Sequence, residues 1–314
     1  MTSRRSLLRA GIAVAATGAL LGAGAPPRPG GPTGTLRIAT GEEAGFYLAF
    51  GQLLAAELNA AHPRLHTVAL PTEASVANLE MLDAGAAELA LSLADIAGAA
   101  TDGAAPFGRR IEVCALGRVY ENYLQLAVRA DSPITSVAGL AGRTVSLSAP
   151  RSGAAVLGER LFAAAGVAIV DRHLPMLEAG EALRQGRIDA MLVSGGVPLP
   201  VLSTLDNEIG IRLLPLAPYL PALRGPGQEA VRVPAGAYRS PEVDTIGVAS
   251  LLVCRPDLPA DVAAAVTRVL VQRAAQLVPA QAVATQFLDV RSLIGTGTVP
   301  LHPGAVATYR ALHG

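Results

Sequence analysis

The sequence contains no lysine and no tryptophan, and only two cysteines among its 314 residues. Without lysine, neither a Walker A phosphate loop nor the Schiff base of a pyridoxal phosphate enzyme can be built. Cys114 and Cys254 both lie in apolar, strand-like runs without zinc-site spacing, so we expect no metal site and no cofactor. An exported protein could join them in a disulfide. We favour two buried free thiols, because cysteine is among the most buried residue types.

Charge is also scarce and balanced. Arginine supplies all 25 basic residues, 25 residues are acidic, and the net charge is zero. A nucleic-acid-binding protein usually shows a basic patch or stripe, and none is visible, so we expect no nucleic-acid partner. Hydrophobic residues make up 51% of the chain, enough for the core of one large domain or of two lobes.

The first 34 residues are typical of an export signal and a linker. Arg4 and Arg5 precede "GIAVAATGALLGAGA" (11–25), an apolar stretch that is shorter than a membrane span. The arginine pair, with Ser before it and Leu-Leu after it, resembles a twin-arginine export signal. Pro26 directly follows the natural cleavage site "AGA" and normally hinders cleavage, so the cut lies elsewhere or the segment stays as an anchor. We expect an extracytoplasmic protein.

One strand–loop–helix plan occurs twice in the rest of the chain. "LRIAT" (36–40) predicts a strand, followed by the loop "GEEAG" and a helix over 46–60. "RTVSLSA" (143–149) predicts another strand, followed by "PRSG" and a helix over 154–165. In each unit a later helix ends at a glycine, Gly85 or Gly186, and an acidic residue then opens an apolar strand. Strands that alternate with helices in this way predict parallel sheets covered by helices.

Two such units predict an α/β fold with two lobes that face each other across a crevice. Open α/β sheets bind ligands at the carboxyl ends of their strands, beside the helix starts. "NYLQLAVR" (122–129) and "TIGVASLLVCR" (245–255) are expected to cross between the lobes. The first lobe would then comprise residues 35–124 plus 246–314, and the second residues 125–245. This arrangement predicts a hinged clamp.

These landmarks resemble the TAXI group of solute receptors, which serve TRAP transporters, over nearly all of residues 35–314. The matching segments are "ATGEEAGFYLAFG" (39–51), "TEASVANLEMLDAGAAELALSLAD" (72–95), "SLSAPRSG" (146–153), "GRIDAMLVSGGVPLP" (186–200), "VPAGAY" (233–238) and "PLHPGAVATYR" (300–310). The resemblance implies a type II periplasmic-binding-protein fold in a monomer. It also implies a small, usually carboxylate-bearing ligand, delivered to TRAP membrane permease subunits. Glu42 and Glu43 stand where the group often has Gly and Thr, which points to a different ligand.

The candidate ligand-binding residues lie where strands end, helices begin or strands cross between the lobes. They are Thr40, Gly41, Glu42, Tyr47, Ser75, Asn78, Tyr123, Arg151, Ser152, Gly153, Ser194 and Gly195. Main-chain N–H groups at helix starts, together with Arg151, would hold a ligand carboxylate. Glu42 or Glu43 either pairs with a cation on the ligand or only favours the helix start. Ser75 either contacts the ligand or caps its helix, and Tyr123 lines the crevice floor or acts in the hinge.

Catalytic motifs are missing from the sequence. It has neither the Gly-x-Ser-x-Gly elbow of hydrolases nor the His-Glu-x-x-His of zinc proteases. We therefore expect a solute-binding protein and not an enzyme. The alternatives are a receptor of an ABC importer, a ligand sensor and, from a different class, a secreted α/β hydrolase using Ser152 or Ser194. The hydrolase requires a histidine within hydrogen-bond reach of one of these serines.

Overall fold

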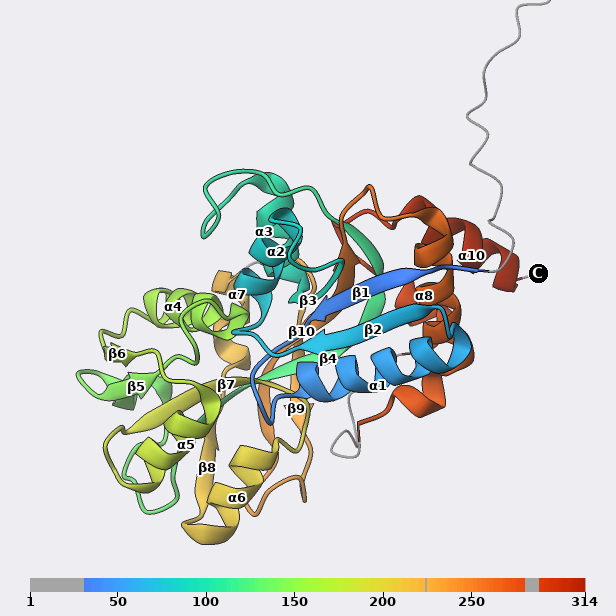
Figure 1. The fold of residues 1–314 in the computed structure, drawn as a ribbon. Helices are drawn as coiled ribbons and strands as arrows, with labels where there is room; N and C mark the ends of the chain where they lie inside the picture. Colours follow the sequence, from blue (N-terminus) through green and yellow to red (C-terminus); the bar gives the residue numbers. More distant parts are fainter. Residues whose placement is uncertain (1–30, 224, 280–287, 314) are drawn as a thin grey trace, which may run out of the picture.

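The computed structural model describes residues 31–223, 225–279 and 288–313 (Figure 1). The predicted export signal and the first part of the linker lie outside the described residues. Within the described ranges, no helix is both long enough and apolar enough to cross a membrane.

The elements follow the chain in three groups. The first group is β1 (Gly34–Ala39), α1 (Phe46–Ala61), β2 (Leu65–Leu70), α2 (Ser75–Asp83), β3 (Leu89–Leu93), α3 (Ala94–Asp102) and β4 (Cys114–Arg129). The second is η1 (Val137–Leu140), β5 (Thr144–Ser146), α4 (Gly153–Ala165), β6 (Val170–Arg172), α5 (Met176–Arg184), β7 (Ala190–Gly195), α6 (Pro200–Glu208), β8 (Ile211–Leu214), η2 (Ala217–Tyr219), α7 (Leu220–Leu223) and β9 (Gln228–Val233). The third is β10 (Val243–Cys254), α8 (Ala260–Gln272), η3 (Ala274–Leu277), α9 (Val290–Leu293) and α10 (Pro303–His313).

All strands belong to one ten-stranded sheet in the order β2-β1-β3-β10-β4-β7-β5-β6, with β8 on β4 and β9 on β10. Strands β2, β1 and β3 are parallel, and β10 runs antiparallel to β3. Strands β6, β5 and β7 are likewise parallel, and β4 runs antiparallel to β7. The two halves therefore share one strand order, which confirms the repeated plan predicted from the sequence.

The helices and turns of this plan lie where the sequence places them. The helices predicted over 46–60 and 154–165 are α1 and α4, each within one residue of the expected bounds. Gly85 and Gly186 follow α2 and α5 with φ of 67° and 69°, the left-handed conformation that glycine adopts without strain. Both parallel units thus begin and end their helices as predicted.

Two long antiparallel strands connect the halves. β4 pairs with β10 through residues 114–124 and with β7 through residues 123–128. β10 pairs with β3 through residues 250–254 and with β9 through residues 243–248. In Figure 1 the N-terminal blue elements lie beside the C-terminal red helices, whereas the green and yellow elements form the other lobe. The two-lobed fold with two crossing strands is confirmed. The boundaries at residues 124 and 246 stay predictions.

The core consists of three apolar clusters. In the first lobe, α1, α8 and α10 pack on one face of β1, β3 and β10. In the second lobe, α5 and α6 pack on β7 and β8. The third cluster continues across the lobes, because it joins Leu79 of α2 and Ile96 of α3 to Leu157 and Leu161 of α4. The lobes are therefore in contact, as in a closed clamp.

The two cysteines face each other at one end of the β4–β10 strand pair, where Cys254 of β10 is the register partner of Cys114 of β4. Both are buried free thiols, as expected, and burial raises the pKa of each. We expect neither to react with Ellman's reagent at pH 8 in the folded protein, and both to react after denaturation in guanidinium chloride. Fast labelling of the native protein, or a disulfide in its intact mass, would contradict this result.

Candidate ligand-binding site between the lobes

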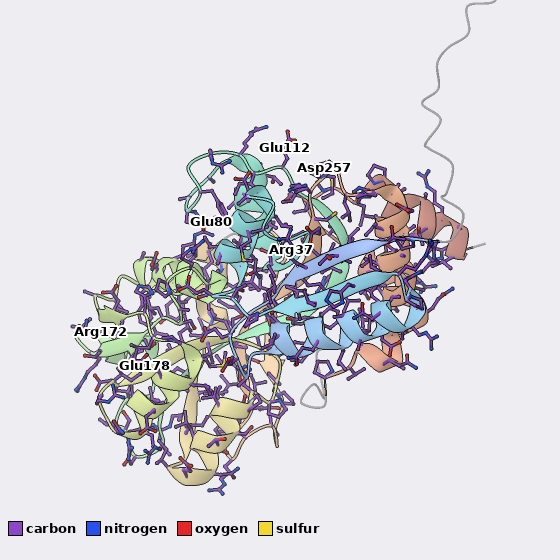
Figure 2. The ribbon with its side chains drawn as sticks, viewed as in Figure 1. Arg37, Glu80, Glu112, Arg172, Glu178 and Asp257 are labelled. Carbon is purple, nitrogen blue, oxygen red and sulfur yellow. The ribbon has the colours of Figure 1, made fainter. Side chains whose placement is uncertain are left out.

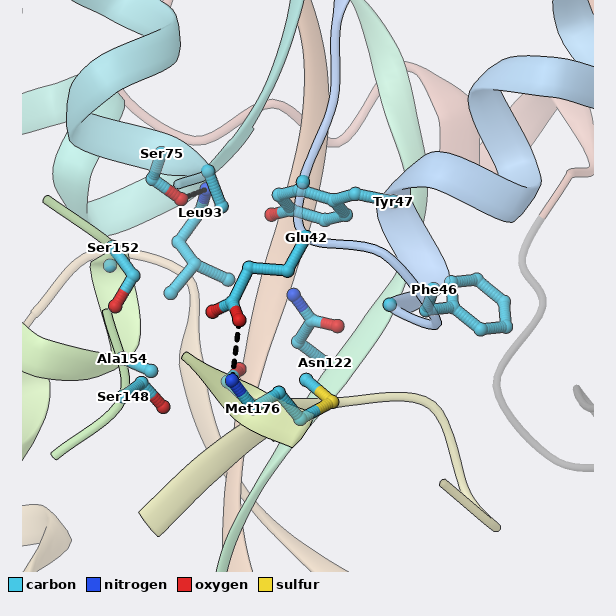
Figure 3. Close-up of a pocket in the computed structure, with 15 residues that line it drawn as sticks. Glu42, Phe46, Tyr47, Ser75, Leu93, Asn122, Ser148, Ser152, Ala154 and Met176 are labelled. Atoms are coloured by element: carbon cyan, nitrogen blue, oxygen red, sulfur yellow. Dashed lines mark hydrogen bonds between the residues drawn. The ribbon is translucent and has the colours of Figure 1, made fainter. Parts of the chain in front are cut away.

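A cavity of about 50 Å³ lies between the two lobes (Figure 3). The starts of α1, α2, α4 and α5 all reach it. Its polar lining consists of Glu42, Tyr47, Ser75, Asn122, Ser148, Ser152 and Ser194. The volume accommodates about four water-sized groups, so the cavity suits a small solute. No group of three or more His, Cys, Asp or Glu in the described part of the chain is placed to hold a metal ion.

The loop between β1 and α1 is a tight turn that aims Glu42 at the second lobe. The Gly45 N–H donates to the Glu42 carbonyl at 2.9 Å. A Cβ atom at Gly45 would lie only 2.8 Å from that carbonyl oxygen, so a larger residue would disrupt the turn. Tyr47 follows in the first turn of α1, where its buried hydroxyl lies 3.3 Å from the Ser250 hydroxyl.

Glu42 makes a direct contact between the lobes. Its Oε2 accepts a hydrogen bond of 2.5 Å from the N–H of Met176, the first residue of α5 (Figure 3). Burial raises the pKa of Glu42, and the main-chain N–H groups of Met176 and Ala149 oppose that rise. A carboxylate at a helix start is stabilised by the free N–H groups and the helix dipole. Glu42 therefore occupies a place where a ligand anion could otherwise bind.

Arg151 also joins the lobes, and it does so through main chain and side chain. Its carbonyl accepts from the N–H groups of Val76 and Ala77, at 3.1 and 3.2 Å, in the first turn of α2. Its guanidinium pairs with Glu80 and lies 3.8 Å from Glu73. Glu80 lies where α2 faces α4 (Figure 2). The Arg151 side chain is thus at the rim of the interface and does not line the cavity.

Three serines that line the cavity form hydrogen bonds with main-chain groups. Ser152 is the N-cap of α4 and accepts from the Ala155 N–H at 3.1 Å. Ser148, with φ of 69°, donates to the Leu192 carbonyl at 2.6 Å. Ser75 is the first helical residue of α2 and not its cap, and its Oγ accepts from the Leu93 N–H at 3.1 Å. Each of these three serine Oγ atoms already has one partner and retains capacity for a ligand.

Two buried polar groups at the cavity lack a hydrogen-bond partner among the described residues. Asn122 of β4 is 4% exposed, and its Oδ1 accepts no hydrogen bond from any described residue. The same holds within the described chain for the Ser194 hydroxyl at the end of β7. A buried acceptor without a donor costs roughly 1–3 kcal/mol. Such groups are rare in folded proteins, and both belong to residues that line the cavity.

The structure brings together seven of the predicted site residues at this cavity: Gly41, Glu42, Tyr47, Ser75, Ser152, Gly153 and Ser194. It places the others elsewhere. Thr40 donates to the Leu70 carbonyl, and Asn78 binds the carbonyls of Thr40 and Leu91. Tyr123 packs against the core of the second lobe.

Gly195 also lies outside the lining, and a Cβ there would meet the Leu199 side chain at 2.8 Å. Eight lining residues were not among the predicted ones, and they include Asn122, Ser148 and Met176. Asn122 and Ser148 lie inside segments that the sequence singled out as a crossing strand and a ligand loop. Their polar side chains in apolar runs were the available signal. Nothing in the sequence pairs Met176 with Glu42, 134 residues away.

Asp95, in the first turn of α3, is buried beside this interface. Its Oδ2 lies 3.7 Å from Arg160 of α4 and accepts from Gln228 at 3.3 Å. Burial raises its pKa to about 6. Between about pH 4 and pH 6 the folded protein therefore keeps a proton that the unfolded chain has lost. The unfolding free energy consequently falls as pH rises through this window, and the loss is complete above pH 6.

We expect Asp95→Asn to be more stable than the parent at pH 8, by on the order of 2 kcal/mol, and similar to it at pH 4. The amide removes a buried charge, and Arg160, with a side chain 38% exposed, stays solvated without its partner. Chemical denaturation of both proteins at the two pH values measures the difference. A variant less stable than the parent at pH 8 would show that the Asp95–Arg160 pair outweighs the burial of the carboxylate.

Comparison with solved structures shows the same fold in two proteins whose TM-scores are 0.52 and 0.50. A protein of Bordetella bronchiseptica RB50 is similar with a TM-score of 0.52 at 16% identity, over 88% of this chain and 80% of that one. XAC2383 from Xanthomonas citri, bound to chloride ion, has a TM-score of 0.50 at 14% identity, over 88% and 95%. The periplasmic aliphatic sulphonate binding protein SsuA from Escherichia coli has a TM-score of 0.47 at 17% identity, over 89% and 83%.

With its two parallel units and two crossing strands, the chain has the two-lobed α/β fold of type II periplasmic binding proteins. A family model matches residues 38–311, and the chain belongs to the NMT1-like family.

Proposed function

We propose that the protein is an exported solute receptor that captures a small organic anion or amino-acid-like solute between two closing lobes. The observation that supports this function best is the polar cavity between the lobes, with its buried, unpartnered Asn122 and Ser194. Ligand sites commonly lie between domains and combine apolar walls with a few well-placed polar groups. The ligand-binding residues are Gly41, Glu42, Tyr47, Ser75, Ser152, Gly153 and Ser194 of the predicted set, joined by Asn122.

The receptor would act outside the cytoplasm and deliver its ligand, as a monomer, to a TRAP-type permease. The arginine pair near the N-terminus supports export, and the resemblance of residues 35–314 to TAXI receptors supports the choice of permease. A receptor of an ABC importer has the same fold and remains the first alternative, and a ligand sensor is the second. Co-purification of the closed, ligand-bound protein with candidate membrane subunits would separate them.

The hydrolase alternative receives no support from the cavity. A serine nucleophile needs a base within hydrogen-bond reach, but histidine is absent from the described residues that line the cavity. His302, the histidine of the "LHPG" segment, accepts from the Gly304 N–H at the start of α10 in the first lobe. Ser152 is engaged as a helix cap.

A thermal-shift screen of the mature protein, refolded to remove carried-over solute, tests the receptor function. The panel comprises amino acids, dicarboxylates, 2-oxoacids and simple amines. A ligand at 100 times its Kd stabilises the folded state by about 2.7 kcal/mol, which is readily visible as a higher Tm. Each stabilising compound is then incubated with the protein and analysed by mass spectrometry. Stabilisation without turnover is expected. Turnover would favour the hydrolase, and the absence of any shift would contradict the receptor function for these classes.

A further inference from the structure

The cavity offers acceptors and one negative charge to its ligand. Its lining includes the Glu42 carboxylate, the Asn122 amide and the hydroxyls of four serines. Arginine and histidine are both absent from the described residues that line it, and the chain has no lysine. A ligand that carries a carboxylate and no cation would face Glu42 in this space, with no side-chain cation to offset the repulsion.

Two helix starts that could bind an anion are already filled by acceptors from the opposite lobe. In α2, the N–H groups of Val76 and Ala77 donate to the Arg151 carbonyl. In α5, the N–H of Met176 donates to Glu42. Helix starts attract anions in general, but at these two the protein itself supplies the acceptor. The cavity is therefore less suited to an anion than the fold alone suggests.

Of the two unpartnered groups, one requires a hydrogen-bond donor and the other can use one. Asn122 Oδ1 can only accept, and it is buried with no donor among the described residues. The Ser194 hydroxyl is similarly buried without a partner there and can accept as well. Glu42 uses Oε2 for Met176 and has further lone pairs available. These three acceptors belong to residues of one lobe, a crossing strand and the other lobe that line the same cavity.

We propose that the ligand is a small primary amine or amino acid whose ammonium group binds between the Glu42 carboxylate, Asn122 Oδ1 and the Ser194 hydroxyl. This inference rests on the proposed receptor function and names its ligand class. An ammonium group carries three donors and no acceptor, so one group can reach all three oxygens. Its hydrogen bond to a carboxylate is charge-assisted and about twice as strong as a neutral one. The cavity volume of about 50 Å³ suits a small ligand of this class.

Isothermal titration calorimetry with matched compounds tests this class on the refolded mature chain. The pairs are glycine with glycolate, alanine with lactate, and ethanolamine with ethylene glycol. Within at least one pair, the amine is expected to bind about 100-fold more tightly than its hydroxyl counterpart, because only the amine places a cation beside Glu42. Tighter binding of glycolate or lactate would overturn the amine class and leave the receptor function standing. No binding by these compounds or by the thermal-shift panel would overturn both.

Two neighbouring carboxylates provide the matched variants. Glu42 lines the cavity, whereas Glu43 is exposed and does not. Glu42→Gln is expected to weaken amine binding at least about 30-fold, since it removes the charge, and Glu43→Gln should leave it unchanged. Asn122→Leu, which removes the second acceptor, should cost at least about tenfold. Melting curves verify that each variant is folded. Unchanged amine affinity in folded Glu42→Gln would overturn the assignment of the ammonium site.

Discussion

Gly153→Val is expected to lower ligand affinity by about 100-fold without unfolding the protein. Gly153 begins α4 in the second lobe, but the atoms closest to it belong to the first. A Cβ there would lie 2.7 Å from Leu93 Cδ1, 2.9 Å from Ser75 Oγ and 3.2 Å from Ile96 Cγ1. The valine side chain would therefore collide with the first lobe only when the lobes close. Overpacking of this kind costs up to about 3 kcal/mol, which corresponds to about 100-fold in affinity.

The control for this variant is Gly139→Val, in the same lobe. Gly139 is exposed in η1, and the nearest atom to a Cβ there is Ile134 Cγ2 at 3.4 Å, an ordinary contact. Titration calorimetry with the best compound of the thermal-shift screen measures both affinities, and small-angle scattering shows whether each variant contracts on binding. Full affinity and full contraction in Gly153→Val would mean that the lobes need not meet at α4 to hold the ligand.

The fold was predictable because the sequence patterns that specify it are local. Each unit repeats a short strand, a loop rich in small residues and a helix that ends at a left-handed glycine, Gly85 or Gly186. Burial of both sheet faces requires helices on either side, and the second long strand must return the chain to the first lobe. The site loops follow from the same logic, since helix starts and strand ends meet at one edge. Glu42, Ser152 and Ser194 were predicted in this way, and all three line the cavity.

Which buried polar residues face the cavity depends on contacts between segments that are distant in the sequence. Thr40 and Asn78 look from the sequence like ligand residues, but their side chains bind main-chain carbonyls of Leu70, Thr40 and Leu91. The sequence does not show whether a buried polar group faces a ligand or a neighbouring strand. Asn122 presents the converse case, because its register in β4 turns it toward the cavity. Only the packing of the two lobes decides between these outcomes.

Asn78→Ala is expected to destabilise the protein by roughly 4 kcal/mol, through loss of bonds inside the first lobe. The fully buried Asn78 Nδ2 donates to the carbonyls of Thr40 and Leu91, at 2.6 and 2.7 Å, and its Oδ1 accepts from Thr72. Alanine leaves both carbonyls inside the protein without a donor, and each such group costs roughly 1–3 kcal/mol. Urea denaturation measures the loss.

The same variant separates a structural Asn78 from a ligand contact. Asn78 does not line the cavity, so its removal should weaken the β1–α2–β3 packing and leave the ligand affinity of the folded fraction within about threefold of the parent. Asn207→Ala, at an exposed position of α6, should change stability by less than about 0.5 kcal/mol and is the matched control. A large loss of affinity with little loss of stability would reverse the assignment. Asn78 would then reach the ligand in a conformation more open than this one, and the site would extend along α2.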